Sequence, residues 1–146
     1  AGALGIMPNP NETTLVVNGD ILTQMDYRAM LIYHREHKAD MTVAVHRLDF
    51  QVPYGVVECD GTNVLGIVEK PLRTVFINAG IYLLDPLAYN YLPSGEAYDM
   101  TDLIASLLHE KRPVVAFPIR EYWMDIGQHA DYEKAQEDMF VGKILE

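Results

Sequence analysis

Cysteine is almost absent from this chain of 146 residues, which contains Cys59 alone. A single thiol cannot form an intrachain disulfide, so the sequence favours a reducing cytoplasmic location over the disulfide-stabilised secreted class. Basic side chains are also few, because 11 Lys and Arg stand against 21 Asp and Glu, for a formal charge of −10. A surface this acidic repels phosphate backbones, and nucleic acid is therefore not an expected partner.

Long apolar runs are lacking as well. No segment of the chain approaches the roughly 18 apolar residues that a membrane-spanning helix needs. The stretch from Ala1 to Met7 is apolar, but no basic segment precedes it, which is atypical of a signal peptide. We therefore expect no membrane partner. With 49% hydrophobic and 22% charged residues, the composition is that of a globular protein, and the length fits one domain over residues 1–146.

Short apolar segments alternate with amphipathic ones along the chain. Strands are predicted at residues 14–18, 41–45, 76–84, 114–117 and 121–124, with a hairpin of 54–59 and 64–69 around Asp60-Gly61-Thr62-Asn63. Helices are predicted from Thr23, which resembles a capping box with Asp26, to about residue 38, and over 101–109 and 129–140. Parallel strands joined by helices, with an inserted hairpin, predict an α/β domain with a mixed sheet.

Two aspartates follow predicted strands, at the edge where ligands bind in open sheets of this kind. Asp20 follows the first strand through Asn18-Gly19, and Asp125 ends the last one within Trp123-Met124-Asp125-Ile126-Gly127. Two carboxylates at one sheet edge suit Mg²⁺, which takes oxygen ligands and keeps several waters. Taken alone, each aspartate is more typical of a turn or a helix cap than of a metal site.

Four further positions are candidates for substrate binding. In Glu69-Lys70-Pro71, the proline is expected to hold Lys70 extended, so that Lys70 can meet a phosphate while Glu69 accepts bonds from hydroxyls. The alternative is a solvated strand end. Gly55 permits either close approach of a ligand or a bend in the strand. Asn78, inside an apolar strand, can bond a substrate or be satisfied by the backbone.

Other polar and aromatic residues are better explained structurally. His34 and His37 are three residues apart on a predicted helix, and without a second cluster of ligands we expect a solvated face and not a zinc site. Cys59 has no histidine nearby in the sequence and is expected to be a packed small side chain. Trp123 is expected in the core or in a pocket wall.

Taken together, the motifs have a family resemblance. In order they are Val17-Asn18-Gly19-Asp20, Pro53-Tyr54-Gly55-Val56-Val57-Glu58, Glu69-Lys70-Pro71, Asn78-Ala79-Gly80-Ile81-Tyr82 and Trp123-Met124-Asp125-Ile126-Gly127. This series, which reaches from Ala1 to about Ala135, resembles the sugar-1-phosphate nucleotidyltransferases, the family of mannose-1-phosphate guanylyltransferase and glucose-1-phosphate thymidylyltransferase.

The resemblance implies a three-layer Rossmann-like nucleotidyltransferase fold and a reaction. A nucleoside triphosphate and a sugar 1-phosphate give a nucleotide-sugar and pyrophosphate, with catalysis mainly by positioning and electrostatics. It also implies the roles of the candidates. Asp20 and Asp125 would hold Mg²⁺, and Lys70 would bind the sugar phosphate, which makes these three the expected catalytic residues.

For the sugar itself, the resemblance implies contacts from Glu69 and the backbone at Gly55 to its hydroxyls, and Asn78 in the stretch that closes over it. The form Asn18-Gly19-Asp20-Ile21 is closer to the guanylyltransferases of mannose or heptose phosphates than to the thymidylyltransferases. The nucleotide and the sugar otherwise stay open.

One part of the family pattern is absent. The glycine-rich stretch G-G-x-G-T-R, whose backbone N–H groups cradle the triphosphate, does not occur, nor does the lysine-proline pair that follows it. We therefore expect an N-terminally truncated domain, an excised fragment more readily than a naturally short protein, and no turnover by this chain alone. The strand with Val16 and Val17 would then expose an apolar edge, through which the chain is expected to form homo-oligomers.

Two other functions remain open at this point. A non-catalytic regulatory or assembly module of the same fold would keep these residues only as structure. A nucleotide-sugar-dependent glycosyltransferase shares a similar α/β core and a metal-binding carboxylate, but Glu69-Lys70-Pro71 and the motif around Asp125 count against it.

Overall fold

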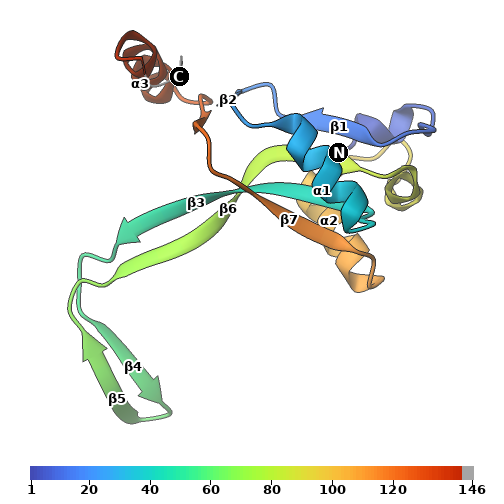
Figure 1. Cartoon of the computed structure of the whole chain (residues 1–146). Helices are drawn as coiled ribbons and strands as arrows, with labels where there is room; N and C mark the ends of the chain where they lie inside the picture. The colour runs from blue at the N-terminus through green and yellow to red at the C-terminus, as the bar shows by residue number, and fades with distance from the viewer. Residues whose placement is uncertain (143–146) are drawn as a thin grey trace.

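A four-stranded mixed sheet organises the protein, whose computed structural model describes residues 1–142 (Figure 1). Its strands are β1 (Thr14–Val17), β3 (Met41–Gln51), β6 (Leu72–Leu84) and β7 (Val114–Ile119). β6 lies between β1 and β3 and runs antiparallel to both, whereas β7 pairs parallel with β3. β1, β3 and β7 therefore run in one direction, and their carboxyl ends share one edge of the sheet.

β3 and β6 are longer than the sequence predicts. Their antiparallel pairing continues from Met41 and Leu84 to Gln51 and Leu72, with an irregularity between Val43 and Val45. Only the inner half of this ribbon is buried, and the outer half is exposed. The apolar runs that predicted the strands therefore stop where the buried part stops. The ribbon carries the predicted hairpin, β4 (Val56–Asp60) and β5 (Asn63–Val68), away from the sheet (Figure 1).

Helices cover both faces of the sheet, which confirms the three-layer α/β prediction. α1 (Tyr27–Glu36) lies on one face, and α2 (Met100–His109) with the short 3-10 helix η2 (Pro86–Tyr91) lies on the other. Two cores result. One contains Met41, Val43, Tyr82, Leu84, Ala88, Tyr89, Leu103 and Leu107. The other contains Met25, Met30, Ala44, Ala79, Ile81, Leu83 and Ile119.

The predicted helix ends are partly right. α1 begins after Asp26, whose side chain accepts bonds from two backbone N–H groups of the first turn. The predicted capping role of Thr23 is wrong, because its Oγ1 instead donates to the carbonyl oxygen of Tyr122 at 2.8 Å. α2 begins at Met100, after its N-cap residue Asp99 and one residue earlier than predicted, and Leu108 near its end is exposed.

Three short elements lie outside the main sheet. They are the 3-10 helix η1 (Leu4–Ile6) near the N-terminus and the strands β2 (Ile21–Thr23) and β8 (Trp123–Asp125). The last helix, α3 (His129–Phe140), has the predicted bounds. No helix within residues 1–142 combines the length and the hydropathy that crossing a lipid bilayer requires.

Two predictions about exposure are wrong. His34 is only 2% exposed, because it lies one helical turn after Met30 on the face of α1 that packs on the sheet. Its Nδ1 is 2.8 Å from Oγ1 of Thr42, and burial lowers the pKa of the imidazole. Cys59 is exposed, because no other element covers the hairpin formed by β4 and β5 in the described part of the chain.

Candidate functional site

Asp20 and Asp125 are brought together by a small antiparallel ribbon made of β2 and β8. Ile21 pairs with Asp125, and Thr23 pairs with Trp123. The backbone N–H of Ile126 donates to the carbonyl oxygen of Asp20 at 2.8 Å. The turn after β1 and the exit of β8 are therefore locked to each other, although they come from distant parts of the sequence.

The two carboxylates converge on Gly127. A Cβ at this glycine would lie 3.0 Å from Oδ1 of Asp125 and 3.4 Å from Oδ2 of Asp20. Oδ1 of Asp125 also accepts a bond from the backbone N–H of Gly127 at 2.9 Å, which fixes the orientation of that carboxylate. Both aspartates are exposed, so the oxygens are open to solvent and to ligands.

This pair fits a hard divalent cation better than zinc. Mg²⁺ is commonly bound by one or two carboxylates, with water and substrate phosphates as the remaining ligands. Zinc sites have three or four protein ligands, most of them histidine nitrogen or cysteine sulfur. Across residues 1–142 no three His, Cys, Asp or Glu side chains are grouped so as to hold a metal. Asp20 and Asp125 could thus hold a hard cation whose remaining ligands are water and phosphate.

Asn78 lies on β6, beside the loop that leads to Asp20. Its Nδ2 donates to the hydroxyl of Tyr82 at 2.8 Å, and its Oδ1 accepts from the N–H of Gly80 at 3.1 Å. Gly80 has φ of 72°, and a Cβ there would be 2.7 Å from Nδ2 of Asn18. This close approach places Asn18 against the Asn78 segment, a proximity that the sequence did not reveal.

Gly55, Glu69 and Lys70 form a second group, where the hairpin joins the ribbon of β3 and β6. Oε2 of Glu69 would be 2.9 Å from a Cβ at Gly55, so this glycine leaves room for the carboxylate. Lys70 has φ of 44°, and the prediction that it is extended is therefore wrong. Its carbonyl oxygen accepts a bond from Nε2 of Gln51 at 3.1 Å. Left-handed backbone at a non-glycine residue is strained and occurs often at functional sites.

The structure does not bring this second group to the aspartate pair. Nε1 of Trp123 donates to the carbonyl oxygen of Ala79 at 2.9 Å, which places the pair near the middle of β6. Lys70 precedes Ala79 by nine positions in the sequence, and most of the residues between them belong to the extended strand β6. Figure 1 shows the hairpin at the far end of the ribbon from β2 and β8. The candidate residues thus form two separate subsites.

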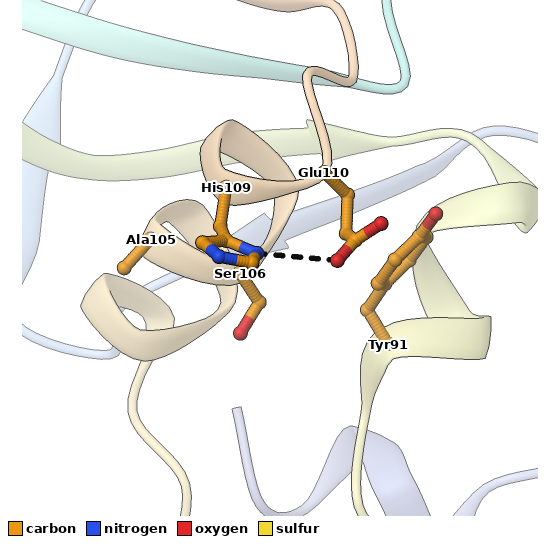
Figure 2. A pocket seen from close by; sticks show the side chains of 5 residues that line it. All are labelled: Tyr91, Ala105, Ser106, His109 and Glu110. Atoms are coloured by element: carbon orange, nitrogen blue, oxygen red, sulfur yellow. Dashed lines mark hydrogen bonds and ion pairs between the residues drawn. The ribbon is translucent and has the colours of Figure 1, made fainter.

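A surface hollow elsewhere does not involve the predicted residues. Figure 2 shows its lining side chains, which come from η2 and from the end of α2. Its volume is about 520 Å³. It is lined by Tyr91, Ala105, Ser106, His109 and Glu110. The 3.2 Å contact between His109 and Glu110 joins two exposed side chains. Nothing in this lining matches the chemistry expected of the motifs.

Comparison with known proteins identifies the family. The family model described as Nucleotidyl transferase matches residues 2–140. The chain belongs to this family. Glucose-1-phosphate adenylyltransferase of Bacillus subtilis is 33% identical over 141 residues, and mannose-1-phosphate guanyltransferase of Pichia angusta is 30% identical over 132 residues. The family resemblance of the motifs is thereby confirmed.

The match covers most of this chain but only part of each relative. It includes 88% of this chain and 37% of the Bacillus subtilis protein, and 87% of this chain and 36% of the Pichia angusta protein. A crystal structure of HddC from Yersinia pseudotuberculosis superposes with a TM-score of 0.62 at 27% identity, covering 88% of this chain and 56% of that one. The nucleotidyl transferase chain thus spans little more than a third of the length of these curated relatives.

Proposed function

We propose that this chain is the metal- and sugar-phosphate-binding portion of a sugar-1-phosphate nucleotidyltransferase. The observation that carries the proposal is the convergence of Asp20 and Asp125 on Gly127, which lacks the side chain that would separate them. Mg²⁺ is the cation proposed for this pair, and when bound it would neutralise charge on the reacting phosphates. Family membership supports the reaction class.

The proposed reaction is a displacement at phosphorus. An oxygen of the sugar 1-phosphate forms a bond to the α-phosphorus of a nucleoside triphosphate. The bond from that phosphorus to the oxygen bridging to the β-phosphate breaks, and pyrophosphate leaves with the electron pair. No redox partner is needed, and the attacking phosphate oxygen carries no proton that must be removed. The protein has mainly to align two anions and offset their charge. Because the structure holds the Lys70 group apart from the aspartate pair, the reaction requires that group to come next to the pair.

The other site residues have binding roles in this proposal. The ammonium group of Lys70 holds the phosphate of the sugar 1-phosphate as a point charge. Glu69, with the open backbone at Gly55, accepts bonds from sugar hydroxyls. Asn78 contributes an amide beside the aspartate pair. Because this chain carries a formal charge of −10, the attraction for an anionic substrate must come from local positive groups, which in this proposal are Lys70 and the bound Mg²⁺.

Mannose 1-phosphate with a guanine nucleotide is the substrate pair that we favour. The support is the sequence Asn18-Gly19-Asp20-Ile21 and the relatedness to the Pichia angusta protein, which is a mannose-1-phosphate guanyltransferase by name. The Bacillus subtilis relative is a glucose-1-phosphate adenylyltransferase, so adenine nucleotide and glucose 1-phosphate form the comparison pair in any assay. A cytoplasmic location, favoured by the single cysteine, belongs to the same proposal.

The separation of the two subsites predicts how the isolated chain binds. Mn²⁺, used as a spectroscopic substitute for Mg²⁺, is expected to bind at Asp20 and Asp125, and mannose 1-phosphate at Lys70 and Glu69. Each should bind whether or not the other is present. Turnover to a nucleotide-sugar is not expected, because the chain lacks the glycine-rich sequence that cradles the triphosphate.

The test measures the two ligands separately. Electron paramagnetic resonance reports free Mn²⁺, and calorimetry reports mannose 1-phosphate. Asp20→Asn and Asp125→Asn are expected to abolish Mn²⁺ binding, whereas the hairpin variant Asp60→Asn should not alter it. Lys70→Ala should abolish sugar-phosphate binding, and Lys134→Ala on α3 is the matched control. Wild-type protein that binds neither ligand would overturn the proposal in favour of a non-catalytic module.

A further inference from the structure

Trp123 attaches the aspartate-bearing ribbon to the main sheet. β2 and β8 pair only with each other, so their position depends on contacts to the four-stranded sheet. Trp123 makes two such contacts. Its indole N–H donates to the carbonyl oxygen of Ala79 at 2.9 Å, and its ring stacks on His46 of β3, with ring centroids 4.9 Å apart and planes at 25°. The indole is thus held between β6 and β3.

The orientation of Trp123 bears directly on Asp125. The two residues are two positions apart in β8, so their side chains leave the same face of the strand. A shift of β8 that follows from a loss of the Trp123 contacts would therefore move Asp125 relative to Asp20. Ile21, which pairs with Asp125, also packs against the core beside Trp123, so both strands of the ribbon depend on this contact.

His46 has a property that packing does not explain. Its Nδ1 is buried, and within residues 1–142 it has no hydrogen-bond partner. A buried nitrogen without a partner is unfavourable, and an apolar residue of similar size would avoid this penalty. The ring does stack on Trp123. Flat stacking requires an aromatic ring at this position and does not require its nitrogen to be bonded.

We propose that His46 is a positioning residue of the nucleotidyl transferase metal site. Its ring fixes the plane of Trp123, and Trp123 in turn fixes β8 so that Asp125 faces Asp20 across Gly127. The inference rests on the proposed function, because it concerns the same cation site. In this proposal His46 does not touch the cation, and it affects the cation affinity through Trp123.

The experiment compares two replacements of His46 with one control variant at another histidine, all in the whole chain. His46→Phe keeps a stacking ring, His46→Leu keeps apolar volume without one, and His109→Leu, at an exposed histidine, is the control for the chemical change. Trp123 is the only tryptophan in the sequence, so its fluorescence reports this site alone. Mn²⁺ affinity is measured by paramagnetic resonance, and stability by thermal unfolding.

His46→Leu is expected to weaken Mn²⁺ binding by about tenfold or more, the range known for residues that orient metal ligands. It should also shift the Trp123 emission while leaving the unfolding temperature equal or higher, since it removes a buried unpaired nitrogen. His46→Phe should keep the wild-type affinity. A residue with a merely structural role would change the unfolding temperature and not the affinity.

The outcomes separate this inference from the proposed function. Wild-type Mn²⁺ affinity and unchanged Trp123 emission in His46→Leu would overturn the role of His46, while loss of binding in Asp20→Asn would still support the metal site. If Asp20→Asn binds Mn²⁺ as well as the wild type does, the proposed site itself is wrong, and the role of His46 falls with it.

Discussion

Asp20 and Asp125 direct one carboxylate oxygen each to the same point, which lies 3.4 Å from Oδ2 of Asp20 and 3.0 Å from Oδ1 of Asp125. That point is where a Cβ on Gly127 would stand. The two carboxylates can therefore approach each other in this way only because residue 127 has no side chain.

Gly127→Ala is expected to disturb this pair. The added methyl group would crowd both oxygens, so Mn²⁺ affinity should fall by about 10- to 100-fold, as for other changes to the surroundings of metal ligands. Stability should change little, because both carboxylates are exposed and can move aside. Paramagnetic resonance and thermal unfolding measure the two effects. Gly19→Ala is the control, because a Cβ there has no neighbour within 4 Å. Equal losses of affinity in the two variants would contradict this explanation.

Lys70→Gly is expected to stabilise the chain while removing a proposed ligand contact. Lys70 has φ of 44°, a conformation that costs an L-residue energy and glycine little. Glycine relieves this backbone strain but loses more conformational entropy on folding than lysine does. The net effect that we expect is an increase of about 0.5–1 kcal/mol in the free energy of unfolding. Mannose 1-phosphate binding should be lost. Urea unfolding and calorimetry test these effects.

Lys38→Gly provides a matched comparison for that variant. Lys38 has φ of 47° and follows the C-cap of α1, a position that glycine favours. It should bring a similar gain in stability without any loss of sugar-phosphate binding. Loss of binding in both variants would mean that general positive charge, and not the site at Lys70, attracts the ligand.

Stability is expected to fall in mild acid because of His34. Burial is the largest cause that lowers the pKa of this imidazole below its usual value of 6.5, with a smaller contribution from Arg35, while Asp85 and Asp40 oppose the shift. Below pH 6.5 the unfolded chain binds a proton that the folded chain resists, so the free energy of unfolding decreases until the lowered pKa is passed. Above pH 6.5 the two states do not differ at this group.

Urea unfolding between pH 7.5 and pH 5.5 measures this effect. His34→Gln cannot bind the proton, yet it retains a polar group that can reach Thr42, so its stability should depend less on pH than that of the wild type. His129→Gln, at an exposed histidine of α3, is the control. Identical pH dependence in the wild type and His34→Gln would show that burial of His34 is not the cause.

The chain is expected to self-associate at high concentration. Within residues 1–142, β1 has a single neighbouring strand, and Leu15 and Val17 on it are 44% and 40% exposed. An apolar edge strand is a template for pairing with another chain. Sedimentation velocity should show larger species, more so at high salt, which screens the negative charge. Leu15→Lys should reduce association more than Ile32→Lys on α1. A monomer at every concentration would contradict the prediction.

The sequence by itself determined the element types and the family. The apolar runs, the Asp60-Gly61-Thr62-Asn63 turn and the helix caps are local signals, and the elements that they predict exist in the structure. The motifs around Asp20 and Asp125 also predicted the family, because the order of motifs along the chain can be recognised from the sequence alone. The predicted lengths of β3 and β6 were too short, because the apolar pattern ends where burial ends, whereas the hydrogen bonding between the two strands continues beyond that point.

Only the tertiary structure decided what lies next to what. The pairing of β2 with β8 joins two short segments from distant parts of the chain, and neither has a pattern strong enough to reveal its partner. Burial of His34 follows from the rotation of α1 on the sheet. The distance between Lys70 and the aspartates follows from the length and direction of the β3 and β6 ribbon. The stack of His46 on Trp123 likewise depends on contacts between strands, which sequence periodicity does not encode.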